Sequence, residues 1–158
     1  MAHETMSPQP SSSVLASARA LQLAAQKGQT PLLLKGKKLA LLSMGEHVAP
    51  ENALFCRAAT ELGAHVAQIH PSLSDLSAPQ ELRLTAQLLG RLYDAVQCDG
   101  VPPPLVRRIA DEAGVPVYDS IASPHHPCSE LVDRLDGDAP LDDKRRFVLQ
   151  ALLLGSLV

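Results

Sequence analysis

The chain has 158 residues, of which 46% are hydrophobic and 20% charged, and its formal net charge is -3. This length suits one domain with a core of its own, and the composition excludes a disordered chain. The slightly acidic balance, with both signs interspersed, argues against a nucleic-acid-binding protein, which is usually basic. Because the longest apolar run is about four residues and residues 1–13 are polar and rich in Pro and Ser, we expect neither a membrane protein nor a secreted one.

Three cysteines, Cys56, Cys98 and Cys128, lie far apart in the sequence. An odd and sparse set of this kind is typical of reduced thiols rather than of a disulfide framework. The sequence therefore predicts a cytoplasmic protein.

Short apolar runs alternate with helical patterns along the chain. Residues 1–11 are expected to be a disordered tail, and residues 12–158 one domain. In chain order, we expect a helix over 12–27, a strand over 39–42, a helix over 50–62, a strand over 65–69, a helix over 78–92, a strand over 94–98, a helix over 103–113, a strand over 115–118, and helices over 127–135 and 141–157.

This alternation predicts the fold class. Strands joined by helices form right-handed crossovers, which give a parallel sheet covered by helices. We expect an α/β fold: a single three-layer domain with a four-stranded parallel sheet flanked by helices, closed by the C-terminal helix. In the helix over 78–92 we expect four leucines to face the core, namely Leu82, Leu84, Leu88 and Leu89.

Ligands of open α/β sheets bind at the carboxyl ends of the strands. Polar side chains follow the first strand at Ser43, Glu46 and His47, and a second group, His126 and Cys128, opens a later helix. His126 is placed to donate a hydrogen bond to a carbonyl, and a helix N-terminus favours anions. These five residues are the candidate ligand-binding residues. No second pair of ligands stands at zinc-type spacing, so we expect no metal site and no cofactor.

Five segments of the sequence resemble one enzyme family in order and at near-family spacing. They are LKGKKLAL (34–41), Phe55 with AATELGAH (58–65), AQLLGRLYDAV (86–96), GVPV (114–117) and HPC (126–128). The family is the aspartate/ornithine carbamoyltransferases, and the similar part is its first, carbamoyl-phosphate-binding domain. The resemblance implies the same α/β fold, and packing of such domains around a three-fold axis.

The family's phosphate-binding loop has no good match here. The family motif Ser-Thr-Arg-Thr-Arg aligns with Val48, Ala49, Pro50, Glu51 and Asn52. This stretch has no guanidinium, lacks one amide donor at Pro50 and carries a carboxylate. A family arginine at the end of the third strand aligns near Asp99. A carboxylate in place of a cation opposes phosphate binding, so tight binding of carbamoyl phosphate is not expected.

The family's second, amino-acid-binding domain also has no counterpart at its expected place. Five residues, 136–140, separate the HPC helix from a segment, 141–157, that resembles the family's closing C-terminal helix. We therefore expect the helix over 141–157 to return and pack against the first one.

Three hypotheses remain open. The first is a non-catalytic domain that acts through oligomerisation, as a homo-oligomer with a trimer favoured, or as a regulatory partner of a full-length carbamoyltransferase in amino-acid metabolism. The second is a module that binds a small anionic metabolite at the strand ends. The third is a residual transferase whose sites are completed by a partner subunit. The basic runs Arg107–Arg108 and Lys144–Arg146 are interpreted as solvated faces.

Overall fold

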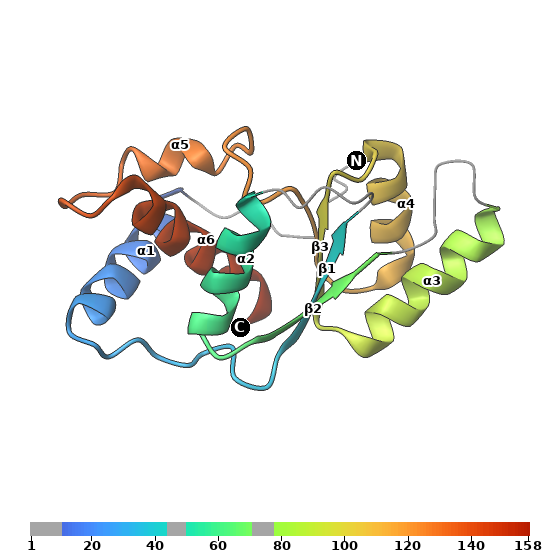
Figure 1. Cartoon of the computed structure of the whole chain (residues 1–158), viewed down its shortest axis with the longest axis horizontal. Helices are drawn as coiled ribbons and strands as arrows, with labels where there is room; N and C mark the ends of the chain where they lie inside the picture. The colour runs from blue at the N-terminus through green and yellow to red at the C-terminus, as the bar shows by residue number, and fades with distance from the viewer. Residues whose placement is uncertain (1–10, 44–49, 71–77) are drawn as a thin grey trace. The chain divides into compact units, whose positions relative to one another are not determined.

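The computed structural model describes residues 11–43, 50–70 and 78–158, which form two compact units. The sheet unit contains Lys37–Ala49 and Val66–Ser120, and the helical unit contains Ser7–Gly36, Pro50–His65 and Ile121–Val158. Together they contain ten helices and strands within the described residues (Figure 1). No helix in these ranges has the length and apolar character needed to cross a membrane.

The sheet unit holds the four-stranded parallel sheet that the sequence predicts. Its elements are β1 (Lys38–Ser43), β2 (His65–Ile69), α3 (Pro79–Leu92), β3 (Ala95–Asp99), α4 (Pro103–Ala113) and β4 (Val117–Asp119). The strand order is β2-β1-β3-β4. β3 pairs in parallel with both β1 and β4, as expected when a helix connects neighbouring strands.

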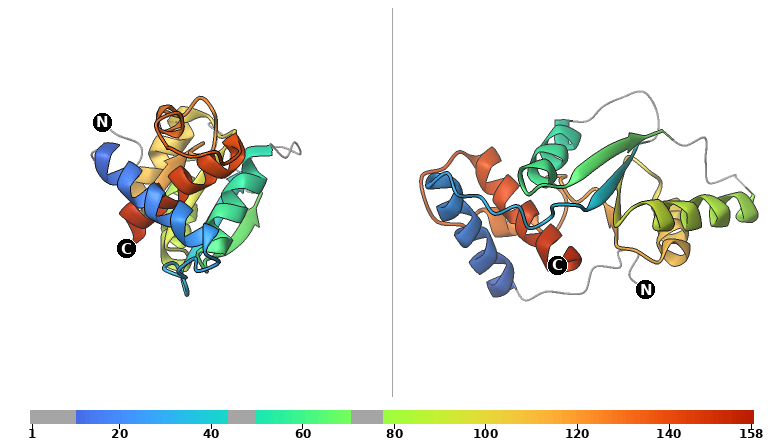
Figure 2. Two further views of the ribbon diagram at one scale, coloured as in Figure 1. Left: turned by 90° about the vertical axis from the view of Figure 1, so that its left-hand side faces the viewer. Right: turned by 90° about the horizontal axis from the view of Figure 1, so that it is seen from below.

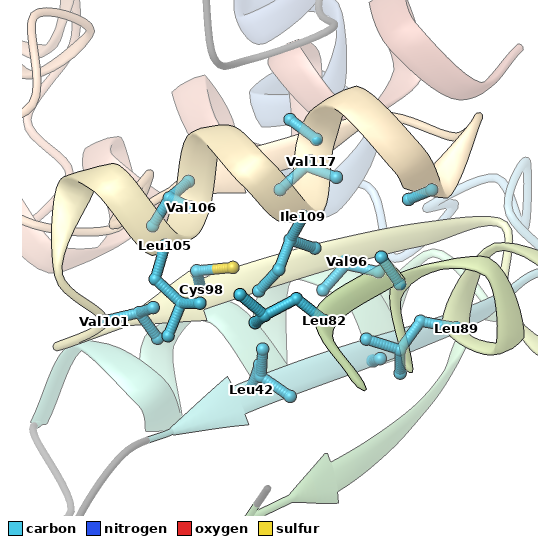
Figure 3. Close-up of a cluster of buried hydrophobic side chains, with 14 residues drawn as sticks. Leu42, Leu82, Leu89, Val96, Cys98, Val101, Leu105, Val106, Ile109 and Val117 are labelled. Atoms are coloured by element: carbon cyan, nitrogen blue, oxygen red, sulfur yellow. The ribbon is translucent and has the colours of Figure 1, made fainter. Parts of the chain in front are cut away.

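The core of the sheet unit lies where α3 and α4 pack against the central strands. β1 and β3 are buried almost throughout, which agrees with their short apolar sequences. Figure 3 shows Leu82 and Leu89 of α3 among side chains of β1, β3 and α4, including Leu42, Val96 and Ile109.

The helical unit consists of α1 (Ser11–Gln26), α2 (Pro50–Glu61), α5 (Ser129–Val132) and α6 (Leu141–Leu157). α6 contacts α1, α2 and α5, and both views of Figure 2 show α1 and α6 side by side. The expected packing of the last helix against the first is therefore confirmed. Most of the middle of α6 is buried, from Arg146 to Leu153.

A position just after α2, Gly63, favours glycine for two structural reasons. Gly63 has a φ of +94°, a region that side chains other than glycine rarely adopt. A Cβ at this position would also lie 3.1 Å from the backbone N and Cα of Lys35. The connector before β1 thus packs closely on the end of α2, and Leu34 donates its N–H to the carbonyl of Leu62 at 2.8 Å.

Three details differ from the sequence-based prediction. α1 begins at Ser11, which the prediction had placed in the tail, and residues 1–10 lie outside the described residues. The helix expected over 127–135 is reduced to α5, because residues 127–128 before it and 133–134 after it form turns. Leu84 and Leu88 do not face the core but are exposed. The reason is that Leu82 and Leu89 already occupy the face of α3 that meets α4 and the sheet.

Candidate functional site

The start of α2 holds Pro50, Glu51 and Asn52, three of the residues in which the sequence resemblance predicts a phosphate loop. Pro50 opens the helix, Glu51 lies in its first turn and is partly exposed, and the side chain of Asn52 is buried. Pro50 has no N–H that could bind an anion. The carboxylate of Glu51 lies in the first turn, where the helix dipole would otherwise favour a bound anion. The other loop candidates, Glu46, His47, Val48 and Ala49, lie outside the described residues.

The loop before α5 places the other two candidates of the helical unit. The backbone N–H of Cys128 donates to Nδ1 of His126 at 3.2 Å, and Sγ of Cys128 donates to the carbonyl of Ile121 at 3.4 Å. Because Nδ1 of His126 is an acceptor, the proton of the neutral ring resides on Nε2. Any donation from His126 to a ligand carbonyl would therefore come from Nε2.

Between α2, this loop and the start of α6 lies a cavity of about 320 Å³, here called the α2–α6 cavity. Its charged lining residues are Glu51, Arg57, Asp142, Arg145 and Arg146. Cys128 lines a smaller hollow of about 20 Å³ that shares Leu54 and Arg145 with the cavity. His126 lines neither of these two hollows.

Arg146 is the most buried cation of the cavity, with a side chain that is 8% exposed. Its Nη1 donates to Asp143 at 2.6 Å, and its Nε lies 2.8 Å from Oε1 of Glu61 without the alignment of a hydrogen bond. The guanidinium also lies 4.9 Å from the ring centroid of Phe147. The interpretation of Lys144–Arg146 as a solvated face is therefore wrong for Arg146, because α6 packs this side chain against the end of α2.

The other two guanidiniums of the cavity also have carboxylate partners. Nε of Arg57 donates to Glu61 at 3.1 Å, and Arg145 lies 3.6 Å from Asp142. An anion entering the cavity would thus compete with carboxylates already in place, and Glu51 adds a further negative charge. The cavity is suited to a small polar molecule of mixed charge better than to a dianion.

Glu61 connects α2 to α6 through Oε1, while its Oε2 accepts from Arg57 of α2 itself. Gln150 donates from Nε2 to Oε1 of Glu61 at 3.2 Å and to the carbonyl of Ala58 at 3.1 Å. Sequence reasoning missed this network, although the four-residue spacing of Arg57 and Glu61 and the three-residue spacing of Asp143 and Arg146 are visible helix-pair signals. The contact that joins these two pairs, between Glu61 and Arg146, depends on the packing of α6 on α2, and no local sequence pattern predicts it.

The sheet unit holds the remaining candidates. Ser43 ends β1 and is 6% exposed, and Asp99 ends β3. The two residues are register partners, so they lie side by side at the carboxyl ends of neighbouring strands. This is the edge at which the sequence predicts a ligand, and Asp99 makes it acidic rather than basic.

The fold places the chain in a known class. Solved structures similar to it include an ornithine carbamoyltransferase from Pyrococcus furiosus, with a TM-score of 0.65 and 25% identity over 78% of this chain and 39% of that one. Another is an aspartate transcarbamoylase from Trypanosoma cruzi, with a TM-score of 0.62 and 20% identity over 84% of this chain and 42% of that one. The fold is therefore that of part of a carbamoyltransferase.

Sequence comparison with curated proteins gives the same answer. The chain is 36% identical over 117 residues to an ornithine carbamoyltransferase of Actinobacillus pleuropneumoniae, which covers 74% of this chain and 35% of that protein. It is 36% identical over 133 residues to a catabolic ornithine carbamoyltransferase of Burkholderia mallei, which covers 81% of this chain and 39% of that protein. No family model matches the chain. By sequence and fold the chain belongs to the aspartate/ornithine carbamoyltransferases, and it spans between a third and two fifths of the length of these relatives.

Proposed function

We propose that this domain is a carbamoyltransferase homologue that does not transfer carbamoyl groups and acts through assembly. The observation that supports the proposal is the first turn of α2, which holds Pro50 and Glu51. By the resemblance of the sequence, these residues align with the family's phosphate-binding loop. Stabilising the leaving phosphate requires preorganised cations and amide donors, and losing one such donor typically lowers the rate by about 10²–10³. Here both an amide and the aligned guanidiniums are replaced.

The cations of the α2–α6 cavity do not compensate for this loss. Arg57, Arg145 and Arg146 each contact a carboxylate, so a phosphate that contacts any of them would also lie near a negative charge. Transfer also requires an amine held within attacking distance of the carbamoyl carbon. The turn after α5 is joined to α6 by only five residues, 136–140. This connection is too short to hold an amino-acid-binding domain at that place in the chain.

Assembly is the proposed role because the family's first domains pack on one another. The partner is a second copy of this chain, with a trimer favoured, or a full-length carbamoyltransferase that the domain regulates. The expected location is the cytoplasm. Light scattering on the purified protein tests this part: a mass of three chains supports it, and a monomer at tens of micromolar contradicts it.

Carbamoyl transfer is tested directly with ornithine and with aspartate as acceptors. We expect neither citrulline nor carbamoyl-aspartate from the purified protein. Product formation that His126→Ala abolishes would overturn the proposal. Calorimetry with carbamoyl phosphate distinguishes this proposal from a residual transferase whose site is completed by a partner subunit. A dissociation constant below about 100 μM would favour the residual transferase, with the missing cations supplied by a neighbouring subunit.

A second candidate function is binding of a small anionic or zwitterionic metabolite in the α2–α6 cavity. It is favoured by Arg145, whose side chain is 35% exposed and whose ion pair with Asp142 is long at 3.6 Å. A ligand carboxylate can replace Asp142 at modest cost, since an exposed pair contributes about 0–1 kcal/mol. Thermal-shift screening should then find a stabilising ligand whose effect disappears in Arg145→Gln and remains in the control Arg107→Gln, which changes an exposed arginine of α4.

A further inference from the structure

The connector between α1 and β1 exposes two adjacent leucines that the function of the α2–α6 cavity does not use. Leu32 and Leu33 are 57% and 51% exposed, whereas the next residue, Leu34, is completely buried. Figure 1 shows the connector as an open stretch of chain that belongs to neither helix nor strand. The helical unit therefore buries one leucine of this run of three and leaves the other two in water.

The fold holds these two leucines in their exposed position. Lys35 donates its N–H to the carbonyl of Leu32 at 3.2 Å, which closes a turn over the run. Leu34 donates its own N–H to a carbonyl at the end of α2 at 2.8 Å, so the turn is fixed on that helix. Burying Leu33 would require this turn to open, because its neighbours on both sides are held.

The same part of the chain is basic and free of acidic residues. Residues 5–45 contain five of the chain's 14 lysine and arginine residues and none of its 17 aspartate and glutamate residues. Lys27 and Lys35 of the helical unit are exposed, and neither forms an ion pair with a described residue. Lys37 and Lys38 follow directly in the sequence. The acidic net charge of the whole chain thus conceals a positive segment around two exposed leucines.

We propose that this connector binds the surface of an anionic lipid membrane. Leu32 and Leu33 enter the boundary between headgroups and acyl chains, and the ammonium groups of Lys27 and Lys35 contact the lipid phosphates. An anionic bilayer complements both features at once, since it is apolar below its surface and negative at it. The cytoplasmic leaflet has this charge, which agrees with the expected cytoplasmic location.

Two other occupants match these features less completely. A nucleic acid would contact the lysines, but it would leave Leu32 and Leu33 in water, and residues 5–45 contain no aromatic side chain on which a base could stack. An acidic protein would require complementary charge only at its own contact. The field of an anionic membrane acts over a whole face of the bound protein and disfavours acids throughout it. The length of the acid-free stretch therefore favours the membrane.

Flotation of the purified protein with lipid vesicles at low ionic strength tests the proposal. Phosphatidylcholine vesicles that contain about 30% phosphatidylserine should carry the protein upwards, and vesicles of phosphatidylcholine alone should carry much less of it. Salt at about 0.5 M should release the bound protein, because it screens the lysines.

Matched variants separate the apolar contact from the charged one. The double change Leu32→Ser with Leu33→Ser should lower the partition coefficient by about tenfold, and Leu88→Ser, an equally exposed leucine of α3, should leave it unchanged. Lys35→Gln should lower it by about fivefold, and Arg107→Gln, an exposed arginine of α4, should not. All of these side chains are exposed, so circular dichroism should show the wild-type fold in each variant.

The proposal is overturned if the wild type does not float with anionic vesicles, if it floats equally with neutral ones, or if the controls lose as much binding as the connector variants. The RNA homopolymer poly(U) tests the alternative. Binding to poly(U) that Lys35→Gln weakens, together with vesicle binding that the leucine variant retains, would identify a general polyanion site instead. The inference is independent of the proposed function, which carbamoyl transfer by the purified protein would overturn without affecting vesicle binding.

Discussion

Replacing Gly90 by alanine should destabilise the protein, although it improves the local helix propensity. Gly90 lies in α3, where alanine is favoured over glycine by about 1 kcal/mol in an exposed helix interior. The position faces α4, however, and an added Cβ would lie 1.8 Å from the carbonyl oxygen of Ala113 and 2.8 Å from its carbonyl carbon. Contacts below 3.0 Å essentially never occur, so the two helices must separate by more than an ångström.

The obstructing atoms belong to backbone, so no side-chain rotation relieves the clash. Overpacking of a core costs about 1–3 kcal/mol and occasionally more, and this case belongs at the upper end. After subtracting the propensity gain, we expect a loss of roughly 2 kcal/mol, or a melting temperature lower by roughly 4–8 °C for a chain of this size.

Thermal and urea unfolding followed by circular dichroism measure this effect. Gly155→Ala is the matched control, because Gly155 is an exposed residue of α6, outside the contact of α3 with α4, and should gain the helix propensity. If Gly90→Ala melts at or above the temperature of the control, the close approach of α3 and α4 is refuted.

Three further predictions concern other buried groups. Arg146→Met should lower the free energy of unfolding of the helical unit by roughly 1–3 kcal/mol in urea unfolding, because it leaves the carboxylate of Glu61 without this partner. The value is kept small because the side chain of Glu61 is a third exposed. Adding Glu61→Gln should recover part of the loss. Burial raises the pKa of Cys98 from 9.0 to about 12, with a smaller contribution from the nearby carboxylate of Asp119. A thiol reagent at pH 8 should therefore modify Cys56 and Cys128, but should modify Cys98 only after the protein unfolds. The unfolded Cys98 thiol ionises above about pH 9 while the folded one does not, so stability should fall as the pH rises from about 9 towards 12, and Cys98→Ala should flatten that slope.

The candidate site was predicted in part. The sequence located the loop with His126 and Cys128, and the start of α2 with its proline and carboxylate. It did not predict the cavity beside them, because two of the three arginines that line it, Arg145 and Arg146, come from α6, more than eighty residues after α2 in the sequence. An arginine within the family's phosphate motif can be recognised from the sequence. An arginine that reaches the same region from a distant helix cannot be, because no local pattern marks it.

What the sequence by itself determined is the succession of elements and the fold class. Strands β1 and β3 are buried almost throughout and consist of short, mainly apolar runs. The glycines that end α2 and α4 are also local signals. What the tertiary structure decided is which side of each helix meets a neighbour. Leu82 and Leu84 are the same residue type two positions apart, and one is buried and the other exposed because α4 and the sheet cover only one face of α3. Arg146 is buried for a similar reason, since the packing of α6 on α2 brings Glu61 to it. Such choices depend on contacts between segments distant in the chain, which local periodicity does not encode.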